Sequence, residues 1–220
     1  SDVYKRQLER SFMPNELITA SSRELATELT AYDEKMLSVF EYLGLPTNNI
    51  LVKVDERRKV FKNIEDVLEP LSSETLETST YISKFLSAVS AGLFDAALNY
   101  LWDETVSQLR FRVSQYDIQY FFDLAVTSDK RTKLSTEDDL VKIDDSELIQ
   151  GAKEIGLISD IGYRLLDNIK FMRNWASAAH PNQVELTGLQ LIDWLETCIK
   201  EVISLPLSNL TIQILSLIHI

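Results

Sequence analysis

Cysteine is nearly absent from this chain of 220 residues, which contains only Cys198. No intrachain disulfide can form, and without a CxxC pair or a His/Cys cluster we expect no structural zinc site. Glycine is scarce as well, and none of the 6 glycines belongs to a Gly-rich phosphate loop. No apolar run predicts a membrane span. We therefore expect a cytoplasmic protein that uses neither a metal nor a cofactor.

Basic residues are also in short supply. The chain has 22 Lys and Arg against 34 Asp and Glu, a formal net charge of −12. This balance works against broad nucleic-acid binding, which needs a basic face. Two short clusters could still form a local patch: Arg57, Arg58, Lys59 and Lys62, and Lys130, Arg131 and Lys133. An ordinary solvated surface is the favoured interpretation of both clusters.

Only two histidines occur, His180 and His219. Residues 1–7 and 215–220 resemble translated sequencing adapters, so we expect these ends to be non-native and exclude them from fold reasoning. His219, which lies in the second of these ends, is therefore not a candidate site residue. His180 is left as the only histidine available for chemistry.

Helical periodicity runs through nearly the whole chain, with no series of strands and turns. It predicts an all-α helical bundle that divides near residue 75. The first helix is expected over 21–44, where apolar residues between Leu25 and Leu43 recur at helical spacing before Gly44 and Pro46. Further helices are expected from 55 to Pro70, from Ser72 onward and over 118–126. The run 82–106 is expected to form one helix or two, with Gly92 as the interruption. Three later helices are expected from their capping residues: one from Asp145 or Ser146 to Gly156, one from Ser159 or Asp160 onward, and one from a capping box at Thr187 to Ile203. Residues 127–142 are expected to form a flexible loop.

The stretch 171–181 places an arginine and a histidine on one amphipathic helix. Arg173 and His180 are seven positions apart, almost two helical turns, so they lie on nearly the same face. Pro181 should end the helix at the histidine. The apolar stripe is expected beside this pair, at Ile158, Ile161, Leu165, Ile169, Met172, Ala176 and Ala179.

These side chains fit one reaction. A histidine titrates near neutrality and can take or give a proton, and the planar fork of arginine suits a phosphate. Asn174 adds a neutral donor and acceptor. Together they fit metal-free cleavage of RNA, in which the ribose 2′-hydroxyl is the nucleophile. When only the spacing is considered, an arginine and a histidine at this separation are more often a surface arginine and a histidine that caps the helix.

The residue pattern resembles a known family. Arg173 and Asn174, followed by small residues, His180 and Pro181, resemble the Arg-polar-x(4–6)-His motif of the HEPN superfamily. The helix order over residues 80–205 is similar too, beginning with an alanine-rich helix from Ser90 to Arg110. The resemblance implies an N-terminal helical region over 8–75 and a HEPN-like helical bundle over 76–206.

This resemblance implies a metal-independent endoribonuclease, of the kind found in phage defence by abortive infection and in toxin–antitoxin systems. His180 would act as general base or acid, Arg173 would hold the scissile phosphate, and Asn174 would orient the phosphate or the histidine. In the family an acidic residue of the first helix sometimes assists. Asp103 and Glu104 both fit that role here, and no motif decides between them.

The resemblance also implies partners. RNA would be the substrate, and an antitoxin or another defence protein could bind the chain. Because family members commonly pair two motifs, we expect a homodimer with His180 of each chain near the two-fold axis. The alternative is a non-catalytic HEPN-like module that binds a nucleotide or a protein, which the acidic charge favours. A scaffold with an accidental motif would give Arg173 and His180 no shared space for a phosphate.

Overall fold

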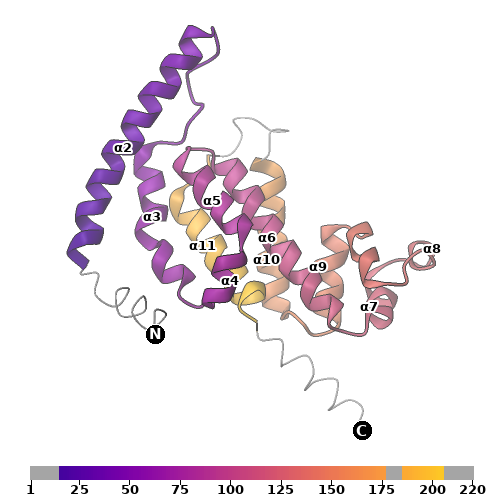
Figure 1. Cartoon of the computed structure of the whole chain (residues 1–220). Coiled ribbons are helices and arrows are strands. Elements are labelled where there is room, and N and C mark those ends of the chain that lie inside the picture. The colour runs from indigo at the N-terminus through magenta and orange to yellow at the C-terminus, as the bar shows by residue number, and fades with distance from the viewer. Residues whose placement is uncertain (1–14, 177–184, 206–220) are drawn as a thin grey trace.

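The computed structural model describes residues 15–176 and 185–205. Every regular element in these residues is helical, which confirms the predicted all-α helical bundle. Figure 1 shows α2 (Asn15–Tyr42) along one side of the molecule and α7 (Ile118–Ala125), α8 (Ser128–Arg131) and α9 (Asp145–Glu154) on the opposite side. Between them lie α3 (Val54–Leu68), α5 (Thr80–Ser90), α6 (Phe94–Ser114), α10 (Asp160–Ala176) and α11 (Gly188–Cys198). Among the described helices, none has the apolar length that crossing a bilayer needs. The ends at 1–7 and 215–220 lie outside the described residues.

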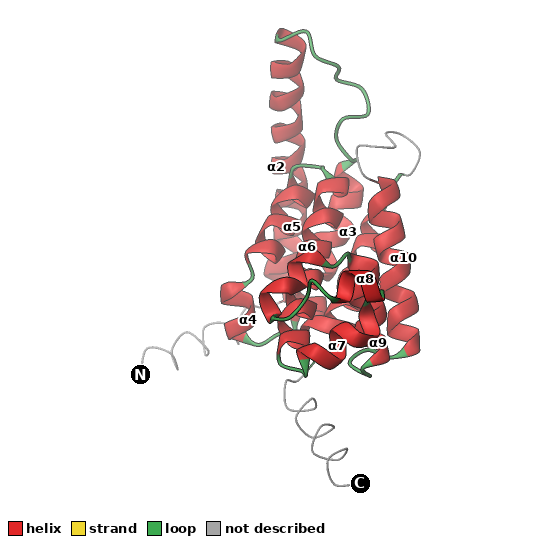
Figure 2. Ribbon diagram, turned by 90° about the vertical axis from the view of Figure 1, so that its right-hand side faces the viewer, coloured by secondary structure: helices red, strands yellow, loops and turns green. Residues whose placement is uncertain are grey.

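The first described helix, α2 (Asn15–Tyr42), extends beyond the rest of the bundle (Figures 1 and 2). It packs on α3 (Val54–Leu68). Of the apolar residues at helical spacing from Leu25 to Leu43, only Leu29 is buried, with 6% of its surface exposed. The rest stay wholly or partly exposed because much of the helix lies past the elements that could cover it.

Arg57 of α3 contacts α2 through an ion pair with Asp33. It was predicted to belong to a surface basic cluster, but it is completely buried. Its Nη1 and Nη2 donate to the two carboxylate oxygens of Asp33 at 2.9 and 2.7 Å, and its Nε donates to the carbonyl of Val52 at 2.7 Å. Nη1 also reaches the carbonyl of Ser90 at 3.2 Å. A buried guanidinium is tolerated here because a bidentate carboxylate and carbonyls satisfy it.

The run from 82 to 106, which the sequence left open, forms two helices. The elements are α4 (Ser73–Thr78), α5 (Thr80–Ser90) and α6 (Phe94–Ser114). Gly92 separates α5 from α6 with φ 74°, a left-handed conformation that glycine adopts without strain. α6 is the central helix, since it packs against α5, α9, α10 and α11.

The segment 127–142 is not the loop that was predicted, because it contains two short helical segments. The elements on this side are α7 (Ile118–Ala125), α8 (Ser128–Arg131), the 3-10 helix η1 (Glu137–Lys142) and α9 (Asp145–Glu154). Asp139 organises η1: it accepts from the Lys142 ammonium at 2.5 Å and from the Ser135 and Thr136 amides at 2.7 and 3.0 Å. These bonds, that of Lys142 first, lower the pKa of Asp139.

The cap of α9 is also one residue earlier than predicted. Asp144, rather than Asp145 or Ser146, accepts from the backbone amide of Glu147 at 2.9 Å. The Glu147 carboxylate accepts in return from the Asp144 amide at 2.9 Å. This reciprocal capping box requires a glutamate three residues after the cap, and only Asp144 has one.

The last described α-helix begins at the capping box that the sequence predicted at Thr187. Thr187 opens α11 (Gly188–Cys198), because its hydroxyl accepts from the Gln190 amide at 3.3 Å and Gln190 accepts from the Thr187 amide at 2.9 Å. The chain continues as a π-helix, η2 (Ile199–Ile203). A Cβ on Gly188 would lie 2.0 Å from the carbonyl oxygen of Glu56. The backbones of α11 and α3 therefore touch, and residues before 75 pack directly against the end of the described bundle.

Candidate functional site

α10 (Asp160–Ala176) carries Arg173 and Asn174. Ser159 caps the helix, since its hydroxyl accepts from the Gly162 amide at 2.9 Å. The buried residues of the helix are Gly162, Leu166 and Ile169. Arg173 follows Ile169 by four positions and continues this row. It is half-buried beside α6, at the described end of the helix.

The predicted apolar stripe along α10 is wrong at two positions. Ile161 and Leu165 are 73% and 42% exposed, whereas Leu166 is fully buried. The packed row begins at Gly162, where a Cβ would lie 2.2 Å from a carboxylate oxygen of Glu201. It continues through Leu166 and Ile169, and Arg173 is half-buried at its end.

Asn99 of α6 holds the Arg173 side chain. The Arg173 Nε donates to the Asn99 Oδ1 at 2.8 Å, and the Asn99 Nδ2 donates to the backbone carbonyl of Asp95 at 2.9 Å. The second bond fixes which end of the Asn99 amide turns toward the arginine. The Arg173 Nη1 also donates to the Asn174 Oδ1 at 3.2 Å. Arg173 and Asn174, both predicted site residues, are therefore in contact.

The structure separates the two acidic residues that the sequence could not distinguish. Glu104 is buried, and its carboxylate accepts from the Ser79 hydroxyl at 2.8 Å and from the Gln108 amide at 3.0 Å. It therefore supports the start of α5. Asp103 lies near Arg173 instead. Burial raises the pKa of Asp103, the negative charge of Asp145 adds to the rise, and the positive charges of Arg173 and Lys84 oppose it.

His180 lies outside the described residues. The predicted approach of His180 to Arg173 stays a prediction, as does a shared space for a phosphate. The described part of the site consists of Arg173 and Asn174 on α10, with Asn99 and Asp103 on α6.

Ion pairs neutralise most of the two predicted basic clusters. The pairs are Arg57 with Asp33, Arg58 with Asp55 at 3.3 Å, Lys59 with Glu56 at 2.5 Å, Lys130 with Glu147, and Arg131 with Asp123 at 2.5 Å. Neither cluster therefore forms a broad basic face. Arg173 differs from these residues, because no carboxylate of the described chain lies within ion-pair distance of it.

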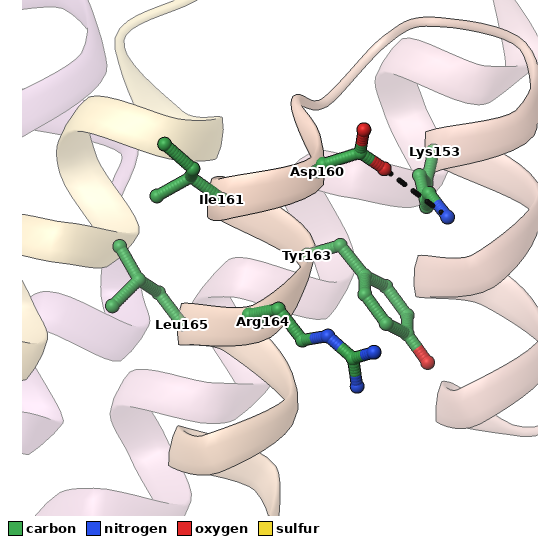
Figure 3. A pocket seen from close by; sticks show the side chains of 6 residues that line it. All are labelled: Lys153, Asp160, Ile161, Tyr163, Arg164 and Leu165. Atoms are coloured by element: carbon green, nitrogen blue, oxygen red, sulfur yellow. Dashed lines mark ion pairs between the residues drawn. The ribbon is translucent and has the colours of Figure 1, made fainter.

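A hollow of about 400 Å³ lies near the other end of α10 (Figure 3). Its lining consists of Lys153, Asp160, Ile161, Tyr163, Arg164 and Leu165. The Lys153 ammonium pairs with Asp160 at 3.1 Å and lies 5.5 Å from the centroid of the Tyr163 ring. Tyr163 precedes Arg173 by ten positions, which is about 15 Å along a helix. This hollow is therefore separate from the Arg173 site.

Sequence reasoning missed Asn99 as a site residue. The available signal was weak: one amide side chain stands between the apolar residues Leu98 and Leu101, and an acid follows four positions later at Asp103. Residues four apart on a helix share a face. Nothing in the sequence, however, shows that this face of α6 turns toward α10.

The chain matches no protein-family model, no curated protein and no solved structure.

Proposed function

We propose that the chain is a metal-independent endoribonuclease of the HEPN type, acting in the cytoplasm in phage defence or in a toxin–antitoxin pair. One observation carries this proposal. The Arg173 guanidinium is oriented by Asn99 at 2.8 Å, and no described carboxylate lies within ion-pair distance of it. In a chain where Arg57, Arg58 and Arg131 are ion-paired, an oriented arginine without a paired anion supports binding of an external phosphate.

The proposed reaction uses the three motif residues. A base removes the proton of the ribose 2′-hydroxyl, the oxygen attacks the phosphorus, and the 5′-oxygen leaves with a proton. His180 serves as the general base or the general acid. Arg173 stabilises the charge that develops on the phosphoryl oxygens. Asn174, beside Arg173, orients the phosphate or the histidine. The products are a 2′,3′-cyclic phosphate and a 5′-hydroxyl, and no redox or metal step is required.

A homodimer is part of the proposal, and the outward face of α10 supports it. This face exposes four apolar side chains: Phe171 and Trp175 lie beside the motif, and Ile161 and Leu165 lie nearer the start of the helix. The Phe171 and Trp175 rings lie 5.8 Å apart. Exposed aromatic pairs of this kind are typical of interface cores. The substitution Phe171→Glu should convert a dimer to monomer in sedimentation, and a wild type that stays monomeric at micromolar concentration contradicts a composite site.

The test of the activity is cleavage of total RNA and tRNA in EDTA. Wild type should yield products with 2′,3′-cyclic phosphate ends, and Arg173→Ala and His180→Ala should both abolish them. Arg164→Ala is the matched control, because Arg164 is an exposed arginine of the same helix outside the motif. It should cleave as well as wild type. Equal loss in Arg164→Ala and Arg173→Ala would show that positive charge on this helix alone, and not the motif, matters.

The alternative is a non-catalytic HEPN-like module that binds a nucleotide or a protein. The net charge of −12 and the neutralised basic clusters favour it. It predicts a folded, dimeric wild type that leaves RNA intact. Under this alternative, Arg173→Ala should weaken nucleotide binding without any activity to lose.

A further inference from the structure

Two tyrosines and a lysine form a small cationic and aromatic cluster on α5 and α6. The Lys84 ammonium lies 5.3 Å from the centroid of the Tyr81 ring and 5.6 Å from that of the Tyr100 ring. Both tyrosines are half-buried, while Lys84 is exposed. No carboxylate of the described residues lies within ion-pair distance of Lys84. The cluster therefore presents a cation between two aromatic rings that has no direct ion pair, although the more distant Asp103 carboxylate acts on it.

This cluster adjoins the Arg173 site through α6. Tyr100 directly follows Asn99, the residue that holds Arg173 at 2.8 Å. Successive residues of a helix diverge by about 100°, so Asn99 turns toward α10 while Tyr100 turns toward α5. Figure 2 shows α6 between these two helices. Arg173, Asn99, Tyr100 and Lys84 thus form one strip across α6, because neighbouring residues of this helix contact the two cations.

We infer that the Tyr81, Lys84 and Tyr100 cluster binds an unpaired nucleotide of the RNA next to the scissile phosphate. This inference rests on the proposed ribonuclease activity. Nonspecific single-strand sites combine a cation for the backbone with aromatic rings on which bases stack. The cluster has both parts, and Tyr100 is the next residue of α6 after Asn99, which contacts Arg173.

The chemistry also explains why a duplex fits poorly. A paired base has its faces covered by its neighbours, so only an unpaired base can lie on a tyrosine ring. In the unbound protein the Lys84 ammonium lies over the rings. Its flexible stem lets it leave them for a phosphate oxygen when a base takes its place. The net charge of −12 disfavours a long duplex further, because a duplex demands a broad basic surface.

The experiment measures binding of a fluorescent oligoribonucleotide to His180→Ala protein, as a single strand and as a perfect hairpin. Lys84→Gln should weaken single-strand binding and lower the slope of log affinity against log salt by about 1. Tyr100→Leu should weaken it about 5- to 100-fold, while Tyr100→Phe retains it because the ring is kept. Lys133→Gln, a change at an exposed lysine on another face, should bind like the parent.

The outcomes separate this site from the activity. In proteins with an intact His180, Lys84→Gln should raise KM with little change in kcat, as expected for lost uniform binding. Cleavage by wild type with unchanged binding in Lys84→Gln and Tyr100→Leu overturns the nucleotide site alone. Binding that depends on Lys84, without cleavage by wild type, overturns the ribonuclease and retains the site. Equal affinity for the hairpin refutes the preference for single strands.

Discussion

The ion pair between Asp33 of α2 and Arg57 of α3 can be tested by replacing Asp33. Replacing Asp33 with alanine removes the carboxylate that accepts from Nη1 and Nη2 of Arg57 at 2.9 and 2.7 Å. Arg57 cannot lose its proton, and its side chain is 0% exposed. The variant must therefore keep an uncompensated charge inside the protein or move α2 away from it. Either course costs stability.

The size of the effect follows from these contacts. Breaking a buried ion pair by removing one partner costs about 3–5 kcal/mol. Asp33 is 18% exposed, so water can partly replace it, and the carbonyls of Val52 and Ser90 remain. We therefore expect a loss of about 3 kcal/mol in the free energy of unfolding. For a chain of this size that is a fall in Tm of about 6–12 °C.

Urea unfolding, followed by circular dichroism, measures this loss. Glu196→Ala is the control, because Glu196 and Lys200 form an ion pair on α11 with both side chains exposed. That change should cost less than about 0.5 kcal/mol. Limited proteolysis at 43–53 then reports whether α2 has detached. A loss below about 1 kcal/mol in Asp33→Ala, with unchanged proteolysis, would refute the view that this pair holds α2 in place.

Three further predictions concern single positions. Gly92→Ala should destabilise the protein far more than Gly44→Ala in urea unfolding: both glycines have positive φ, but only at Gly92 would the Cβ meet the Arg57 guanidinium, at 2.6 Å. Burial raises the pKa of the Cys198 thiol to about 12, so a thiol reagent at pH 8 should label it only in the urea-unfolded chain. Because the pKa of Asp103 is raised in the folded state, ionisation of Asp103 costs stability as pH rises through that pKa. In urea unfolding, Asp103→Asn should therefore be more stable than wild type at neutral pH. The difference should vanish below the pKa that Asp103 has in the unfolded chain.

The fold was more predictable than the contacts between its helices. Periodicity and capping patterns are local, so the sequence indicated the all-α class and the helix start at Thr187, while it left open whether one helix or two surround Gly92. The orientation of α10 depends instead on how closely Gly162 approaches Glu201 of the π-helix, 39 positions later. No local pattern contains that information. The apolar side chains of Ile161 and Leu165 therefore indicated the wrong face.

Arg57 and Arg173 show the same limit for a site. In the sequence, Arg57 belongs to a basic cluster and Arg173 to a motif, and neither has an obvious partner. Arg57 finds its partner in Asp33, 24 positions away. Arg173 finds Asn99, 74 positions away. One partner neutralises the arginine and the other only orients it, a difference that depends on tertiary packing and cannot be found from spacing.

The acidic composition gives that difference its meaning. With 34 acidic residues against 22 basic ones, carboxylates pair with most of the cations in the two basic clusters. On the strip across α6, Lys84 instead contacts aromatic rings and Arg173 contacts an amide. The Asp103 carboxylate acts on both cations from beyond ion-pair distance. A cation without a direct ion pair attracts an external anion more strongly than a paired one. Under the proposed function, this strip is therefore where a single phosphodiester strand would bind.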